Sequence, residues 1–233
     1  MINTIFPLQI QHTGDGMKII YETLKDNLLF AGIEFGDFEK IMACLSAKVT
    51  RYEKDDIILL AGGRVSAVGL VLSGSVKIIK EDIDGRIMLL NELGATEIFG
   101  EVFACAGVDS SPVTVQAAED AEVLFIGYRK IIAMCSAVCP FHTKMVENML
   151  KLIAQKSLHL SQRIDILSKR STREKLLAFL DAQSGGAKSF QIPFNREELA
   201  HYLCVDRSAM SAELSKMRAD GLIRYQKNLF EMP

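Results

Sequence analysis

The feature that most constrains the fold of this chain is a 28-residue run, Pro140–Leu167, that contains no glycine and no second proline. Such a run predicts one helix about 40 Å long, which is too long to pack wholly against one small domain. Six apolar residues lie in it at steps of 3, 4, 7, 4 and 3, close to a heptad repeat: Val146, Met149, Ile153, Leu160, Ile164 and Leu167. We therefore predict that this helix is the interface of a homodimer, the alternative being a helix buried within one chain.

Short β-rich runs separated by glycine-containing turns fill the stretch between Asp56 and Ile126. The runs are Ile57–Leu60, Val68–Leu72, Val76–Lys80, Ile87–Leu90, Val113–Ala117 and Val123–Ile126. The pair Asp84-Gly85 separates the third run from the fourth and predicts a hairpin. Many short strands at this spacing indicate an antiparallel roll, sandwich or barrel and not a parallel α/β sheet.

The sequence before these runs predicts little regular structure. Residues 1–17 are expected to form a mobile leader, because Gly14-Asp15-Gly16 would interrupt any helix or strand. A short helix is expected over Gly36–Leu45, where four apolar residues share one face.

The composition excludes several classes of protein. Hydrophobic residues make up 49% and charged residues 24%, which is the balance of a globular chain with a real core. No apolar stretch of about 18 residues and no secretion signal are present, so we expect a cytoplasmic protein without a membrane partner. Five cysteines without a framework spacing fit reduced thiols. No phosphate-binding glycine loop, Gly-x-Ser-x-Gly or His-Glu-x-x-His motif occurs, so we do not expect an enzyme.

The charge is divided unevenly along the chain. The formal net charge is −2, but residues 168–233 carry a net +3 and residues 1–167 a net −5. A basic C-terminal piece on an acidic body indicates an appended anion-binding module.

This C-terminal piece has the pattern of a winged helix-turn-helix. A helix over Thr172–Gln183 and a short strand over Phe190–Pro193 are expected first, and a hairpin turning at Lys227-Asn228 is expected last. Between them, six small or apolar residues are spaced to pack two helices across a tight turn: Leu199, Ala200, Leu203, Val205, Met210 and Leu214. A generic helical hairpin is the alternative, but the strand before it and the hairpin after it favour DNA binding.

Three helix ends in this piece can be predicted from single residues. Asn195 with Glu198 three residues later forms a capping-box pattern at the first helix, and Asp206 can cap the second. Gly221 is expected to stop the second helix.

The second helix and the hairpin carry the residues predicted to contact DNA. Arg207 lies in the first turn of the helix, where a guanidinium can reach a guanine, whereas Lys227 lies at a position suited to a phosphate. The alternative is that Arg207 only pairs with Asp206, and that Ser208 and Ser211 read the bases. The full predicted set is Arg196, Arg207, Ser208, Ser211, Ala212, Lys216, Arg224 and Lys227.

A glycine-punctuated β-roll, a long helix and a winged helix-turn-helix, in this order, resemble the Crp/Fnr family of bacterial transcription regulators. The stretches that carry the resemblance are Val71–Lys77, Asp84–Arg86, Phe99–Glu101 and Arg196–Ile223. It implies an α+β fold with three parts: an antiparallel β-roll effector domain over residues 18–139 (a double-stranded β-helix, like a jelly roll), a dimerisation helix over residues 140–167 and a winged helix-turn-helix over residues 168–233.

The resemblance also implies a function. Occupancy of the β-roll by a small-molecule effector would reorient the winged helices of a homodimer, which then enter successive major grooves of a near-palindromic DNA site. RNA polymerase is expected as a further partner.

The effector pocket departs from the family's best-known pattern. Members that bind cyclic AMP follow a Gly-Glu pair, here Gly100-Glu101, by an arginine that falls here at Ser111-Pro112, and residues 103–118 contain no lysine or arginine. A buried cyclic phosphate would lack its cation, which argues against cyclic AMP. A pocket around Val102, Phe103, Val113 and Val115 suits a largely apolar molecule, unless the regulator works without an effector. The predicted pocket residues are Gly100, Glu101, Val102, Phe103, Ser111, Val113 and Thr114.

The recognition helix departs from the family as well. The family reads bases at positions that fall here on Arg207, Ser208, Ser211 and Ala212. Ser208 replaces the usual glutamate, Ala212 replaces the usual arginine, and Glu213 occupies a place that is normally apolar. The resemblance therefore implies DNA binding but not the family's best-known recognition sequence.

Cofactors are not expected in the roll. Members with an iron–sulfur cluster have cysteines clustered near the N-terminus, whereas the first cysteine here is Cys44. None of the histidines lies in the roll, which argues against haem: His12, His142, His159 and His201. The spacing Cys135-x3-Cys139-Pro140-x-His142 could bind a metal or haem, or act as a thiol switch in a redox-sensing regulator. We favour two buried thiols at a helix junction, with an exposed histidine and no metal.

Overall fold

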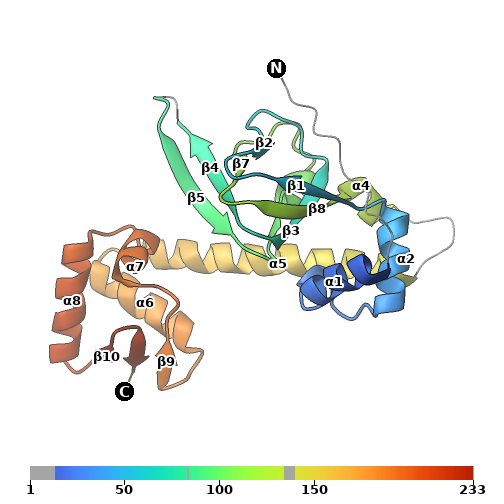
Figure 1. The fold of residues 1–233 in the computed structure, drawn as a ribbon. Coiled ribbons are helices and arrows are strands. Elements are labelled where there is room, and N and C mark those ends of the chain that lie inside the picture. The colour runs from blue at the N-terminus through green and yellow to red at the C-terminus, as the bar shows by residue number, and fades with distance from the viewer. Residues whose placement is uncertain (1–13, 83, 134–139, 233) are drawn as a thin grey trace. The chain divides into compact units, whose positions relative to one another are not determined.

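The computed structural model describes residues 14–82, 84–133 and 140–232 (Figure 1). The chain divides into two compact units, Met1–Ala154 and Gln155–Pro233, and each has a hydrophobic core of its own. The division falls inside α5 (Pro140–Ser168), which confirms the single long helix predicted from the sequence. In the part of the chain that the structure describes, no helix is both long enough and apolar enough to cross a membrane.

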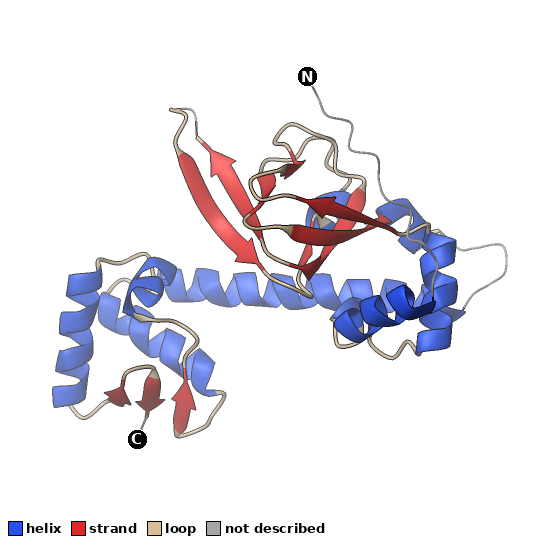
Figure 2. Ribbon diagram, viewed as in Figure 1, coloured by secondary structure: helices blue, strands red, loops and turns tan. Residues whose placement is uncertain are grey.

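The described strands of the first unit form a roll of two four-stranded antiparallel sheets (Figure 2). One sheet has the order β1-β8-β3-β6, formed by Lys48–Tyr52, Ala121–Gly127, Ala67–Ser73 and Ile98–Phe99. The other has the order β2-β7-β4-β5, formed by Ile57–Leu59, Thr114–Ala117, Val76–Glu81 and Ile87–Leu93. The predicted antiparallel roll is therefore confirmed.

The hairpin predicted at Asp84-Gly85 is also confirmed. Strands β4 and β5 pair from Val76 opposite Leu93 to Glu81 opposite Ile87. The carboxylate of Asp82 accepts hydrogen bonds from the backbone nitrogens of Asp84 and Arg86, each at 2.9 Å. Gly85 takes a φ of 77°, which an L side chain rarely adopts.

Two other glycines set how closely the segments of the roll approach. A Cβ atom at Gly69 would lie 2.3 Å from the ring of Phe99, so only glycine lets β6 pack onto β3. Gly74 has a φ of 74°, and a Cβ there would lie 2.2 Å from the carbonyl oxygen of Asp120. The first contact matters for the site, because Phe99 leads directly into Gly100-Glu101.

Short helices cover one end of the roll. They are α1 (Gly14–Leu24), the 3-10 helix η1 (Leu28–Phe30), α2 (Phe35–Leu45), α3 (Glu101–Ala106) and α4 (Tyr128–Ile132). Their apolar faces and the roll share one core, in which the largest fully buried side chains include Phe30, Phe38, Leu24, Leu70, Leu124 and Ile126.

Helix α1 corrects one prediction from the sequence. Residues 14–17 were expected to belong to an irregular leader, but α1 begins at Gly14 and runs through Gly16. The reason is burial: Met17 is 4% exposed and Leu24 is fully buried. Burying two large apolar side chains stabilises the fold by several kcal/mol, which outweighs the roughly 1 kcal/mol cost of each helical glycine. Residues 1–13 lie outside the described residues.

The first part of α5 is anchored in the core of the first unit. Met145, Met149 and Leu152 lie in that core, each at most 6% exposed. Between them the buried amide of Asn148 donates hydrogen bonds to the carbonyl oxygens of Leu29, at 3.1 Å, and Ala31, at 3.0 Å. These two bonds hold α5 against η1 and the residue that follows it, Ala31.

We predict that Asn148→Ala lowers the free energy of unfolding of the first unit by about 1–3 kcal/mol, because carbonyl oxygens in a buried region lose their donor. Asn148→Asp should cost more, since a carboxylate would then face two carbonyl oxygens. Urea unfolding followed by circular dichroism measures both, with the exposed neighbour Glu147→Ala as the control. An Asn148→Ala protein as stable as the control would show that these bonds contribute nothing.

Candidate nucleic-acid interface

The second unit is a winged helix-turn-helix. It contains the last part of α5, then α6 (Thr172–Ser184), α7 (Arg196–Tyr202) and α8 (Arg207–Ala219). Its three described strands form an antiparallel sheet in the order β10-β11-β9, built from Arg224–Gln226, Leu229–Glu231 and Ser189–Gln191. The predicted helix contacts are present, since Leu199, Ala200, Leu203, Met210 and Leu214 are all buried in one core.

The predicted caps position both helices of the motif. Asn195 accepts hydrogen bonds from the backbone nitrogens of Glu197 and Glu198, and the Glu198 carboxylate accepts one from the backbone nitrogen of Asn195, completing a capping box. Asp206 caps α8 by accepting from the nitrogen of Ala209 at 2.9 Å. Cys204 takes a left-handed φ of 52° in the turn between the helices, at the close approach that Ala200 permits.

The first turn of α8 contains an exposed arginine and a serine whose hydroxyl is hydrogen-bonded. Arg207 is exposed, while the hydroxyl of Ser208 donates to the carboxylate of Asp206 at 2.5 Å. This bond and the one from Ala209 hold the pKa of Asp206 below its usual value. Asp206 thus accepts hydrogen bonds from the first turn of its own helix. Ala212 and Lys216 are exposed farther along α8, and Ser211 is half-buried.

Arg196 has a structural role that the sequence did not reveal. Its guanidinium lies 4.9 Å from the ring centre of Tyr225 and 5.1 Å from that of Phe230, and it donates to the carbonyl oxygen of Lys227 at 2.9 Å. Burial against these groups lowers the pKa of Arg196. The guanidinium of Arg218 also lies 5.2 Å from the ring centre of Tyr225. Arg196 therefore holds the wing, the hairpin of β10 and β11, against the start of α7.

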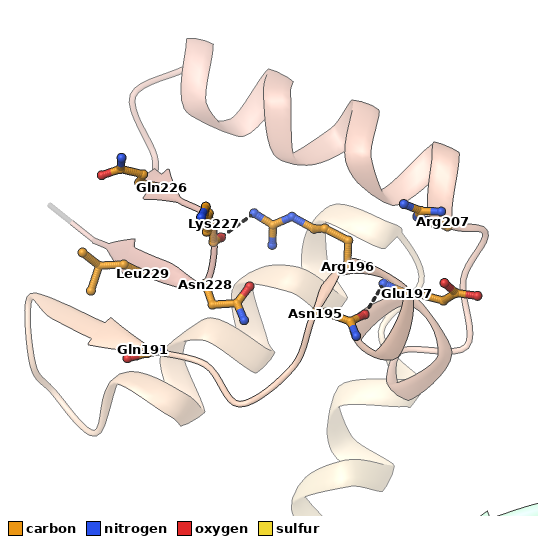
Figure 3. A pocket seen from close by; sticks show the side chains of 9 residues that line it. All are labelled: Gln191, Asn195, Arg196, Glu197, Arg207, Gln226, Lys227, Asn228 and Leu229. Carbon is orange, nitrogen blue, oxygen red and sulfur yellow. Dashed lines mark hydrogen bonds between the residues drawn. The ribbon is translucent and has the colours of Figure 1, made fainter.

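A hollow of about 710 Å³ lies between this wing and the starts of α7 and α8 (Figure 3). Three of the predicted DNA-binding residues line it: Arg196, Arg207 and Lys227. Lys227 lies at the tip of the wing with a left-handed φ of 53°. The remaining lining residues include four side-chain amides that are not in the predicted DNA-binding set: Gln191, Asn195, Gln226 and Asn228. Arg224 is exposed on β10 and does not line the hollow.

The unusual Glu213 on α8 has a partner on α6. Nε of Arg173 donates to its carboxylate, and another nitrogen of Arg173 lies 2.8 Å from the carboxylate of Asp220. These hydrogen bonds raise the pKa of Arg173. The side chain of Glu213 is only 18% exposed, so an ion pair replaces the apolar contact expected there and ties α8 to α6.

The predicted effector residues lie on two segments, one at the start of α3 and one that leads into β7. Gly100, with a φ of 79°, precedes α3, and Glu101 is 2% exposed. Ser111 is also 2% exposed, and its hydroxyl donates to the carbonyl oxygen of Val113 at 2.7 Å. Backbone bonds join Ser111 to Gly62 and Gly63 at 2.8 Å each. The position of the family's arginine thus holds a small side chain that bonds within its own segment.

The other predicted pocket residues differ in burial. Val113 is 6% exposed, and the hydroxyl of Thr114 accepts from the nitrogen of Ala61 at 3.1 Å. Phe103 packs against the core of the roll. Val102 is 47% exposed, so it does not extend an enclosed apolar wall as expected.

The cysteine–histidine spacing can be placed only in part. Cys135 and Cys139 lie outside the described residues. His142 was expected to be exposed, but it is 6% exposed, because α2 packs over the start of α5. Within the described residues, no group of three or more histidine, cysteine, aspartate or glutamate side chains is arranged to hold a metal ion.

Known proteins match both units of the chain. A family model for the cyclic nucleotide-binding domain matches residues 49–137, and one for the Crp-like helix-turn-helix domain matches residues 174–231. The CRP-like protein Clp of Xanthomonas oryzae pv. oryzae is 23% identical over 221 residues, which cover 88% of this chain and 91% of Clp.

Two solved structures share the fold. The c-di-GMP responsive regulator CLP of Xanthomonas campestris aligns with a TM-score of 0.55 at 21% identity, over 85% of this chain and 99% of that one. The catabolite activator protein of Thermus thermophilus aligns with a TM-score of 0.52 at 23% identity, over 88% of this chain and 93% of that one.

The fold and the matched domains together define a DNA-binding transcription regulator with an effector-binding domain. The chain belongs to the Crp/Fnr family of bacterial regulators, and the relatives that it matches are regulators and not enzymes.

We predict that Arg196→Met lowers the stability of the second unit by about 1 kcal/mol, because methionine keeps the apolar stem but removes the stacked guanidinium and its bond to the wing. Thermal unfolding followed by circular dichroism measures the loss. Arg224→Met, on the exposed side of the wing, is the matched control and should leave the stability unchanged within a few tenths of a kcal/mol. If both variants melted alike, Arg196 would not hold the wing.

Proposed function

We propose that this protein is a homodimeric, sequence-specific DNA-binding regulator that acts on DNA in the bacterial cytoplasm, with RNA polymerase as a partner. The observation that carries the proposal is that Arg207, at the start of α8, and Lys227, at the tip of the wing, line the same hollow in a unit of net positive charge. A helix N-terminus with an exposed arginine suits base readout in a major groove, and a wing lysine suits an adjacent phosphate.

The surroundings of Arg207 support direct readout of a guanine. Oδ1 of Asp206 accepts from Ser208 and Ala209, so the α8 cap uses one of the two carboxylate oxygens. The guanidinium of Arg207 is exposed, and it can form a bidentate bond to the O6 and N7 atoms of guanine. The hydroxyl of Ser208 donates a hydrogen bond to Asp206, which leaves Ser208 a smaller part in base readout than Arg207.

The two kinds of contact predict different responses to mutation. Arg207→Ala should cost about 1–3 kcal/mol on the cognate duplex and little on a scrambled one. Lys227→Gln should weaken binding to both duplexes alike and flatten the salt dependence, because a phosphate contact releases counterions without reading a base. Fluorescence anisotropy titrations at two salt concentrations measure both effects. Equal losses on the two duplexes would show that Arg207 contacts only the backbone.

The proposed dimer interface is a stripe along α5 whose residues are exposed or half-buried in their own chain. Met149 does not belong to it, because this residue is buried in the core of its own chain, whereas Leu150 is 65% exposed. With Leu150 in its place, the stripe runs at alternating steps of four and three residues: Val146, Leu150, Ile153, Ser157, Leu160, Ile164 and Leu167. This is the spacing of a two-stranded coiled coil, with Ser157 as a single polar position that can fix the register.

Substitutions at two leucines of α5 that are almost equally exposed can test this interface. Leu160, in the stripe, is 60% exposed, and Leu158, outside it, is 63% exposed. Leu160→Asp should convert dimers to monomers in sedimentation velocity at micromolar concentration, because it would bury an unpaired charge between the helices. Leu158→Asp should leave the dimer intact. Monomers from both variants, or from neither, would contradict the assigned stripe.

The proposed effector of the roll is a small molecule without a buried phosphate. Clp of Xanthomonas campestris is described as responsive to c-di-GMP, a phosphodiester, but the position of the family's arginine is here the buried Ser111. Its hydroxyl already bonds Val113, so an anion placed there would meet no cation and no free donor from this side chain. A largely apolar ligand would not incur this cost.

Calorimetry with purified protein should show no saturable heat with cyclic AMP at tens of micromolar. Ser111→Arg restores the missing cation and should create or strengthen binding of the cyclic nucleotide, because charge-assisted bonds to phosphate are the strong ones. Tight binding of cyclic AMP to the unmodified protein that Ser111→Arg fails to improve would contradict this view of the pocket.

A further inference from the structure

A cysteine and a histidine that are 98 residues apart in the sequence meet where α2 packs over the start of α5. Sγ of Cys44 lies 3.9 Å from Nε2 of His142. Cys44 is exposed, whereas His142 is 6% exposed, and Nδ1 of this histidine has no hydrogen-bond partner among the described residues. A buried imidazole thus directs one nitrogen at a thiol that solvent can reach.

A lysine lies on the same face of α2 as Cys44, four residues before it. Lys40 lies one turn before Cys44 on α2, and its Nζ atom is 5.9 Å from the ring centre of Phe141, the neighbour of His142. Asp37, one turn farther back, pairs with Lys40 at 3.2 Å. A neighbouring imidazole can accept the proton of a thiol, and the thiolate is the nucleophile in cysteine chemistry.

We propose that Cys44 and His142 form a reactive cysteine–histidine pair, a modification site at which hydroperoxides oxidise the Cys44 thiol. Nε2 of His142 takes the thiol proton, and the sulfur attacks one peroxide oxygen as the O–O bond breaks. The sulfur loses two electrons and becomes a sulfenic acid. The leaving oxygen receives the proton from His142, so hydrogen peroxide is reduced to one molecule of water.

The chain supplies its own control for this reaction. Cys204 is also exposed, but it lies in the turn between α7 and α8, where its backbone nitrogen bonds the carbonyl oxygen of His201. Trypsin releases the two thiols on separate peptides, residues 41–48 and residues 197–207, each with one cysteine. Mass spectrometry can therefore follow both thiols in one sample.

The experiment treats the reduced full-length protein with hydrogen peroxide in the presence of dimedone, which traps sulfenic acids. We expect Cys44 to be labelled about tenfold faster than Cys204, and His142→Gln to slow Cys44 about tenfold while Cys204 is unchanged. Circular dichroism checks that the variant is folded. In concentrated urea, which separates α2 from α5, the unmodified protein should label both cysteines at similar rates.

Two results would overturn the proposal. One is equal labelling of Cys44 and Cys204 in the folded, unmodified protein, a comparison that does not depend on how well the variant folds. The other is a folded His142→Gln protein in which Cys44 reacts as fast as before.

Discussion

One helix contributes to two hydrophobic cores, and the proposed assembly depends on that constraint. Helix α5 places Met145 and Met149 in the core of the first unit and Ile166 in the core of the second. The helical turns between these anchors bury few side chains within their own chain. Leu158 and Leu160 are among the exposed residues of these turns. Isolated helices are marginal in water, so a stretch like this gains most of its stability from a partner surface.

The sequence predicted those features that arise from local periodicity and capping. Short β-rich runs between glycine-containing turns located most strands of the roll. The Asn195 and Asp206 caps were identified correctly because each depends on residues within three positions. Features that depend on distant packing could not be found in this way. Helix α1 forms through Gly14 because the core buries Met17, and periodicity alone could not show that α5 turns Met149 inward and Leu150 outward.

At the candidate DNA interface, too, local patterns could be predicted and contacts between distant residues could not. Spacing identified the exposed residues of α8 and the wing, since the turn and helix pattern fixes which positions face outward. The aromatic stacking of Arg196 on Tyr225 and the contact of Cys44 with His142 join residues that are 29 and 98 positions apart. Residue types alone carry no signal for such pairs, because an arginine at the start of a helix and a cysteine near the end of one are common in any chain.

The backbone conformation of Lys227, at the wing tip, indicates that this position favours charge over stability. Lys227 has a left-handed φ of 53°, a conformation that costs most L residues about 1 kcal/mol or more and that asparagine tolerates better. A turn built only for stability would therefore place asparagine here and keep the same backbone. Lysine instead retains a positive charge in the turn between β10 and β11, so the fold gives up some stability to display that charge. A more stable wing would then be a weaker ligand for a polyanion, and stability and affinity would oppose each other at this single residue.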